Sequence, residues 1–242
     1  MLFSTITAAF FYATSAYAAA LPPAPGKPHN YTPAKNLDNL AKLFPQSDLT
    51  SPDGMALKYV VLGIGTQNYT CANASAVPGT TGAVATLYDI GTKLNNDRDA
   101  KWKIATISPL ALSMAEWAPQ LVDMSLQAQG FQNVAGHHFF ADVAGTNTPT
   151  FAFDQLSAPY PLCQVAKFGA VDAPKTACTG KNGLPAVQWL YLQHKAGIAQ
   201  GGITTVYRVE TAGGNKPATC QGMPPTWEVK YAAQYWVYGP KQ

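Results

Sequence analysis

Two adjacent histidines and two aspartates are the residues of this 242-residue chain whose types suit acid–base chemistry. His137 and His138 precede Asp142 in one strand-like segment, and Asp154 closes the next. Because alternate side chains of a strand share a face, His138 and Asp142 are expected on the same side. An imidazole oriented by a carboxylate can act as a general base or as a single metal ligand. The candidate catalytic residues are therefore His138, Asp142 and Asp154, unless His138 is a partly buried histidine bonded to the backbone.

The two aspartates also suit carbohydrate chemistry. Glycoside hydrolysis uses two carboxyl groups about 5 to 10 Å apart. Asp142 and Asp154 stand at the ends of neighbouring predicted strands, so they would meet if these strands pair as a hairpin. The alternative is that both are ordinary turn carboxylates.

Other catalytic signatures are missing from the sequence. It contains no G-x-S-x-G elbow, no H-E-x-x-H pair and no Walker loop. The sequence therefore predicts neither a metal nor a cofactor, and it does not decide whether the protein is an enzyme.

Aromatic residues are plentiful, with 12 Tyr, 10 Phe and 5 Trp, and many of them lie in the last three predicted strands. Trp236 and Tyr238 alternate with Tyr231 and Tyr235, so they are expected on the opposite face. With Trp189 they are the candidate binding residues, because exposed Trp and Tyr stack on sugar rings or anchor protein partners. The alternative is that these rings fill a two-layer core.

Short apolar or alternating runs bounded by Gly, Pro, Asn and Thr predict the strands. They are Leu57–Ile64, Val84–Ile90, His137–Val143, Thr150–Asp154, Val187–Leu192, Ile203–Glu210 and Trp227–Tyr238. Asn36 precedes a short predicted helix, and Ser108-Pro109 predicts the start of another that runs to Gln129 and breaks at Pro119. No β-α alternation is present. The prediction is an all-β fold, a single antiparallel sandwich or barrel domain over residues 36–242 with one or two short helices.

The N-terminal residues have the features of a targeting signal. Residues 1–18 are uncharged, mostly apolar and end in Ala16-Tyr17-Ala18, which is typical of a signal peptide. Residues 19–35 form a Pro-rich leader expected to be flexible. No later run is long and apolar enough to predict a membrane span. The protein is therefore expected to be secreted and extracellular.

The even number of cysteines and the glycosylation sequons are typical of a protein from an oxidising compartment. Four cysteines allow three pairings, of which we expect Cys163 with Cys178 and Cys71 with Cys220. Sequons make Asn30, Asn68 and Asn73 candidate glycosylation sites.

Composition excludes some partners. Hydrophobic residues make up 47% of the chain and charged residues 12%, so the composition is not that of a disordered protein. A net charge of +3 gives no basic face suited to a nucleic acid.

Five blocks resemble a family of secreted fungal and bacterial domains of unknown function. They are Gly63–Cys71, Gly136–Phe140, Val187–Leu190, Gly201–Gly214 and, with Cys220, Val229–Tyr235. The resemblance covers about residues 51–238 and implies an extracellular domain without an established reaction. Members are sometimes labelled malate dehydrogenase, but Gly63-Ile-Gly65-Thr-Gln-Asn68 lacks the third glycine of a dinucleotide fingerprint. The sequence does not support that activity.

The function expected from the sequence is therefore a secreted, disulfide-bonded binding module, for cell-wall polysaccharide, a host surface or another extracellular protein. The alternative is a secreted carbohydrate-active hydrolase or lyase that uses His138 with Asp142 or Asp154. The oligomeric state is left open.

Overall fold

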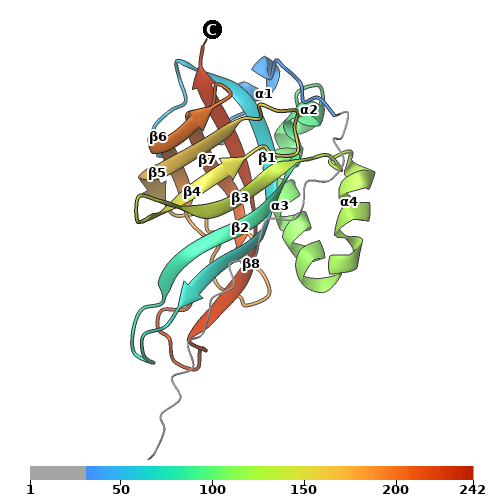
Figure 1. Cartoon of the computed structure of the whole chain (residues 1–242). Coiled ribbons are helices and arrows are strands. Elements are labelled where there is room, and N and C mark those ends of the chain that lie inside the picture. Colours follow the sequence, from blue (N-terminus) through green and yellow to red (C-terminus); the bar gives the residue numbers. More distant parts are fainter. Residues whose placement is uncertain (1–30, 242) are drawn as a thin grey trace, which may run out of the picture.

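A computed structural model describes residues 31–241 and contains a closed barrel of eight antiparallel strands (Figure 1). Each strand pairs with the next along the chain, and the last pairs with the first. The strands are β1 Met55–Thr70, β2 Gly79–Asp89, β3 Val134–Val143, β4 Thr146–Ala152, β5 Leu162–Val171, β6 Trp189–Gln200, β7 Thr205–Gly213 and β8 Thr226–Pro240. The all-β antiparallel prediction is confirmed, and the pairing of β1 with β8 makes the fold a barrel and not a sandwich. The predicted signal peptide, residues 19–30 of the leader and Asn30 lie outside the described residues.

All seven predicted strands are present, although most of their ends differ by several residues. The sequence reading missed β5. Its pairing with β6 contains two irregularities, one between Cys163 and Val165 and one between Lys167 and Gly169. Such bulges interrupt the alternation of side chains between the two faces, which is the signal used to recognise a strand.

The barrel interior holds one hydrophobic core. Alternate residues of the strands point inward, and large members of this cluster are Phe151, Phe153, Tyr231 and Tyr235. Gly63 makes room for one of them, because a Cβ atom there would lie 2.5 Å from Cε2 of Tyr235.

A second core lies outside the barrel wall, where helix α3, Ala100–Trp117, packs on β1, β7 and β8 (Figure 1). Segment 42–50 follows helix α1, Asp38–Ala41, and also contributes to this core. The Phe44 ring meets Tyr207 and Trp236 edge to face, at centroid distances of 4.9 and 5.5 Å. The outer faces of β7 and β8 are therefore covered by other parts of the chain.

The helices between β2 and β3 differ from the prediction. They are α2 Gly91–Leu94, α3 Ala100–Trp117, the 3-10 turn η1 Pro119–Leu121 and α4 Val122–Gln129. The expected start at Pro109 is wrong, because α3 begins nine residues earlier and includes Pro109. Ile104, Ile107, Ala111 and Leu112 form its buried stripe, which outweighs the loss of one backbone N–H donor at the proline. The predicted break at Pro119 is present.

One disulfide joins Cys71, just after β1, to Cys220, in the loop before β8. The expected Cys163–Cys178 bridge is wrong, because both thiols are free. Cys163 belongs to the core inside the barrel, whereas Cys178 packs against the core outside it. The barrel wall separates the two sulfur atoms, which the spacing of the cysteines could not show.

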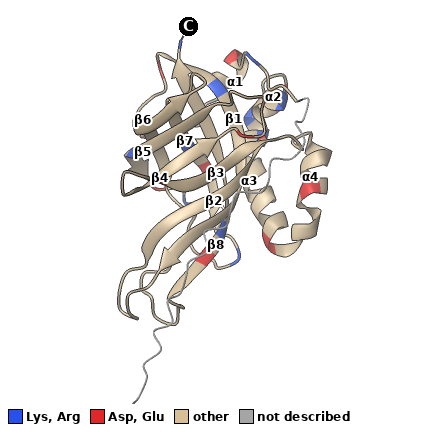
Figure 2. Cartoon of the chain, viewed as in Figure 1, with Lys and Arg blue, Asp and Glu red and all other residues tan. Residues whose placement is uncertain are grey.

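Charged side chains are sparse and scattered over the described ribbon (Figure 2). No helix among the described residues has the length and apolar character that a membrane crossing requires.

Candidate functional site: the barrel cavity

A cavity of about 570 Å³, partly open to solvent, occupies one end of the barrel interior, and we refer to it as the barrel cavity. Its apolar wall includes Ala83, Phe140, Phe151, Leu190, Leu192 and Tyr235. Its polar lining includes Gln67, His138, Lys167, Asp172, Arg208 and Lys216. An eight-stranded barrel is just wide enough for side chains to fill it or for one small ligand to bind, and the core described above fills only part of this one.

His138 lies on β3 and points into the barrel, where it is only 5% exposed. Its ring stacks on Phe151 at a centroid distance of 4.2 Å. Nδ1 lies 2.9 Å from the carbonyl oxygen of Thr150, which can only accept, so Nδ1 carries the proton. Burial lowers the pKa of His138 to about 4, and the charge of Arg208 acts in the same direction, against the Thr150 hydrogen bond. At neutral pH the imidazole is uncharged and Nε2 is an acceptor.

Arg208 projects from β7 into the same cavity. Its Nε and Nη2 donate to the carbonyl oxygen of Gln188, at 3.1 and 2.9 Å. The positive charge of Arg208 affects the pKa of buried tyrosines in the barrel. Burial raises the pKa of Tyr69 to about 12 and also raises that of Tyr235, and in both cases Arg208 opposes the rise. The guanidinium group therefore favours negative charge in this part of the barrel.

Gln67 on β1 supplies a buried donor to the cavity lining. The residue is 5% exposed, and its Nε2, although it lies beside the Tyr231 hydroxyl group, makes no hydrogen bond of good geometry within residues 31–241. A buried amide without a partner costs roughly 1–3 kcal/mol. Five buried side-chain polar atoms of the described chain lack a hydrogen-bond partner, and Gln67 Nε2 is the one among them whose residue lines the barrel cavity.

The predicted catalytic carboxylates do not lie with His138. Asp154 pairs instead with His137 on the outer side of the barrel wall, with Nδ1 to Oδ1 at 2.9 Å. Asp142 is exposed and accepts from the backbone N–H of Gly145 at 2.8 Å in the β3–β4 turn. β3 and β4 do form the expected hairpin, but Asp142 pairs with Asn147 beside the turn, whereas Asp154 follows β4 at its far end. The expectation that the two aspartates meet is therefore wrong.

The predicted binding aromatics form no exposed face. Trp236 is 0% exposed, and Tyr238 and Trp189 are also buried. Phe44 packs on both Trp236 and Tyr238. The alternative that these rings belong to a two-layer core is the one the structure supports, since they lie in the core outside the barrel wall.

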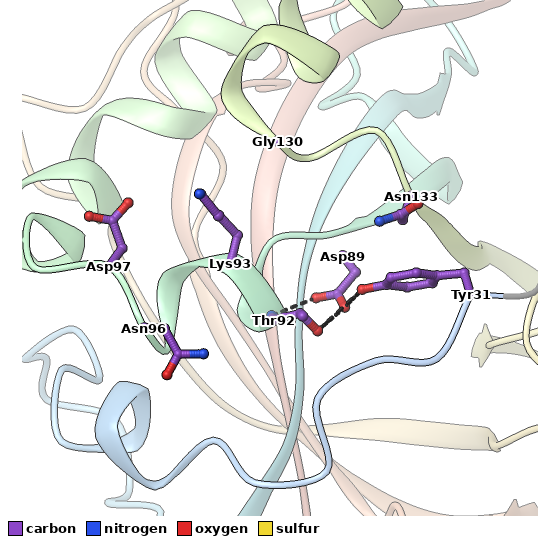
Figure 3. Close-up of a pocket in the computed structure, with 8 residues that line it drawn as sticks. All are labelled: Tyr31, Asp89, Thr92, Lys93, Asn96, Asp97, Gly130 and Asn133. Carbon is purple, nitrogen blue, oxygen red and sulfur yellow. Dashed lines mark hydrogen bonds between the residues drawn. The ribbon is translucent and has the colours of Figure 1, made fainter.

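A second, smaller hollow of about 270 Å³ lies beside α2 (Figure 3). The hydroxyl groups of Tyr31 and Thr92 both point at the buried Asp89 carboxylate, which accepts a hydrogen bond from each. The backbone N–H of Thr92 donates to the same carboxylate at 3.1 Å. These groups satisfy one another, which is typical of a structural contact that ties residue 31 to the start of α2.

The two described sequons differ in setting. Asn68 is half-buried within β1, and its Oδ1 accepts from Thr66 Oγ1 at 3.1 Å. Asn73 is exposed in the β1–β2 loop, where its Oδ1 accepts from Ser75 Oγ at 3.0 Å. Of these two, Asn73 has the surface-loop setting usual for a glycan.

Sequence reasoning missed Arg208 and Gln67 as site residues. Single polar residues inside alternating strands read as solvent-facing positions, and only closure of the barrel shows that their faces point inward. A signal was nevertheless available, because each of the five sequence blocks described above contributes at least one residue to the cavity lining.

Comparison with known proteins assigns the chain to a family but assigns it no function. No curated protein and no solved structure matches it. One family model matches residues 52–239, which is well over half of the chain and includes all eight strands except for the last residue of β8. The chain belongs to the family described as Protein of unknown function (DUF3455).

Proposed function

We propose that this protein is an extracellular binding module that takes a small molecule into the barrel cavity. The observation that carries the proposal is the cavity itself, with a volume of about 570 Å³ inside a closed barrel. Ligand pockets typically measure about 300–1,000 Å³ and combine an apolar wall with a few convergent polar groups. Buried His138, Gln67 and Tyr235 beside Arg208 make up such a set.

Two features support an extracellular location. The Cys71–Cys220 disulfide is typical of an oxidising compartment, and residues 1–18 have the sequence pattern of a signal peptide. Burial of Trp236, Tyr238 and Trp189 removes the aromatic surface on which an extended polysaccharide was expected to bind. The proposal therefore turns from a polysaccharide on the outside of the sheet to a small molecule inside it.

The hydrolase or lyase alternative has less support. It requires His138 to act with Asp142 or Asp154, and these carboxylates lie in the hairpin turn and on the outer face. Asp172 lines the barrel cavity, but it accepts from Gln188 Nε2 at 2.9 Å. A binding function uses the observed groups without requiring a catalytic carboxylate beside His138.

The test is to block the cavity and measure binding. Thr80 is exposed and lines the cavity, whereas the next residue, Thr81, is also exposed and does not line it. A panel of small neutral, anionic and cationic aromatic and aliphatic molecules is screened by thermal shift, and saturable binders are titrated by calorimetry. Thr80→Trp should abolish binding and Thr81→Trp should retain it. Equal binding to both variants, or no saturable binder, would contradict the proposal.

A further inference from the structure

The unpartnered amide of Gln67 points to a ligand with an oxygen acceptor. Nε2 can only donate, and buried donors in folded proteins almost always have a partner. Gln67 lines the barrel cavity beside the Tyr231 hydroxyl group, but its Nε2 makes no hydrogen bond of good geometry among the described residues. A ligand oxygen in the cavity would supply the missing acceptor.

The charges around the cavity indicate that this oxygen is anionic. Lys167, Arg208 and Lys216 line the cavity, opposed by one carboxylate, Asp172. Arg208 forms no ion pair in residues 31–241; its guanidinium group donates to the carbonyl oxygen of Gln188 and lies beside the Tyr235 hydroxyl group. Lys216 donates to the carbonyl oxygen of Pro78 and Asp172 accepts from Gln188, and their opposite charges offset each other in the lining, which leaves the charges of Lys167 and Arg208 in excess. A planar guanidinium that has no carboxylate partner suits a carboxylate ligand.

The rest of the cavity wall suits an apolar body. Phe140, Phe151 and Tyr235 surround the His138 ring, with centroid distances to it of 5.6, 4.2 and 5.6 Å. Leu190 and Leu192 line the cavity from β6. Aromatic rings gain from stacked or edge-to-face contact beyond the area that they bury.

We propose that the ligand of the barrel cavity is a monocarboxylate with an aromatic or aliphatic body, whose carboxylate binds Arg208 and Gln67 and whose body packs on the His138–Phe151 wall. This inference rests on the proposed function and specifies the class of its ligand. It assigns the three polar groups distinct parts. Arg208 supplies charge, Gln67 supplies a directed donor, and neutral His138 is part of the wall.

Three molecules with one body and different charge test the proposal: 3-phenylpropanoate, 3-phenylpropanamide and 3-phenylpropylamine. Each is titrated by calorimetry at neutral pH and at millimolar concentration into the whole protein. The carboxylate should bind at least about tenfold more tightly than the amide, and the amine should bind most weakly. Arg208→Gln should weaken binding of the carboxylate about tenfold or more and leave binding of the amide within about twofold. Loss of a hydrogen bond to a charged group lowers affinity by about that factor.

Further variants keep the test decisive if Arg208→Gln fails to fold. Gln67→Met preserves volume and removes the donor, and it should weaken the carboxylate several-fold. Lys195→Met is the matched control for Lys167→Met, because Lys195 is exposed on β6 and does not line the cavity. It should change nothing, whereas Lys167→Met should weaken the carboxylate alone.

The outcomes separate the two proposals. Equal binding of all three molecules, or equal losses for all three in Arg208→Gln, would overturn the carboxylate inference and leave the cavity as a binding site. Preference for the amine would do the same. Absence of binding by all three would overturn the inference, and the block at Thr80 would then decide the broader proposal with other molecules.

Discussion

His137 and His138 are neighbours in the chain, yet their imidazole rings lie on opposite sides of the barrel wall. His137 bonds the Asp154 carboxylate at a half-buried outer position, whereas His138 is buried against Phe151 inside. The alternation of a strand dictates this separation. The consequence is that the histidine with a carboxylate partner is away from the cavity, and the histidine that lines the cavity has none.

The buried imidazole predicts a loss of stability in acid. The pKa of His138 is about 4 in the folded protein, because of burial and then the charge of Arg208, against about 6.5 in an unfolded chain. Below pH 6.5 this histidine takes up a proton in the unfolded chain but not in the folded protein. The contribution of neutral His138 to the free energy of unfolding is therefore fully present above pH 6.5 and is lost as the pH falls to about 4. The loss from this group is up to about 3 kcal/mol.

Urea unfolding between pH 4 and 7 measures this loss. His138→Gln should unfold with a shallower pH dependence than the unmodified protein, and His137→Gln should keep the steep one. Identical pH profiles for His138→Gln and the unmodified protein would show that burial of this imidazole is not the cause.

Truncating the aromatic residues of the outer core is predicted to affect stability and not a surface contact. Trp236→Ala should lower the free energy of unfolding by about 3–5 kcal/mol, because a fully buried indole is removed. Trp117→Ala is the matched control, since Trp117 is 67% exposed on α3, and it should change stability by less than about 0.5 kcal/mol. Equal stability of the two variants by urea unfolding would mean that Trp236 is exposed in solution.

The cysteine pattern predicts two reactive thiols after unfolding without reductant. Cys163 and Cys178 should both be alkylated, and peptide mass spectrometry should find Cys71 joined to Cys220. Replacing the pair Cys71 and Cys220 by alanine should cost about 4–5 kcal/mol if the loop-entropy account of disulfides holds. Cys178→Ala, at a half-buried position, should cost much less. No alkylated thiol would contradict the assignment, because it would require a second bridge.

The Asp89 contact predicts that residue 31 contributes to stability. Tyr31→Phe removes one of the hydroxyl donors to a buried carboxylate and should lower the free energy of unfolding by about 1–2 kcal/mol (Figure 3). Tyr160→Phe, whose hydroxyl makes no hydrogen bond within residues 31–241, should stay within about 0.5 kcal/mol. Equal effects of the two variants would contradict the assigned contact.

Local pattern was enough to predict seven of the eight strands but not their partners. Thr150–Asp154 and Trp227–Tyr238 were recognisable as strands from their alternation. The Ser108-Pro109 pair was misleading as a helix start, because the buried apolar stripe of α3 begins before this pair and continues beyond it. Which residues share the interior depends on closure of β8 onto β1, an interaction between distant parts of the chain. Arg208 and Gln67 could therefore be found only after closure, and the aspartates were placed wrongly for lack of the hairpin register.

Amide chemical-shift mapping shows whether a small molecule binds in the barrel cavity. The ¹⁵N-labelled protein is titrated with 3-phenylpropanoate, or with the tightest binder of the screen. We expect the largest shifts at the amides of Gln67, His138 and Arg208, on three different strands. Shifts gathered instead at Thr92 and Asn133 beside α2, or along α3, or no saturable shifts at all, would contradict binding in this cavity.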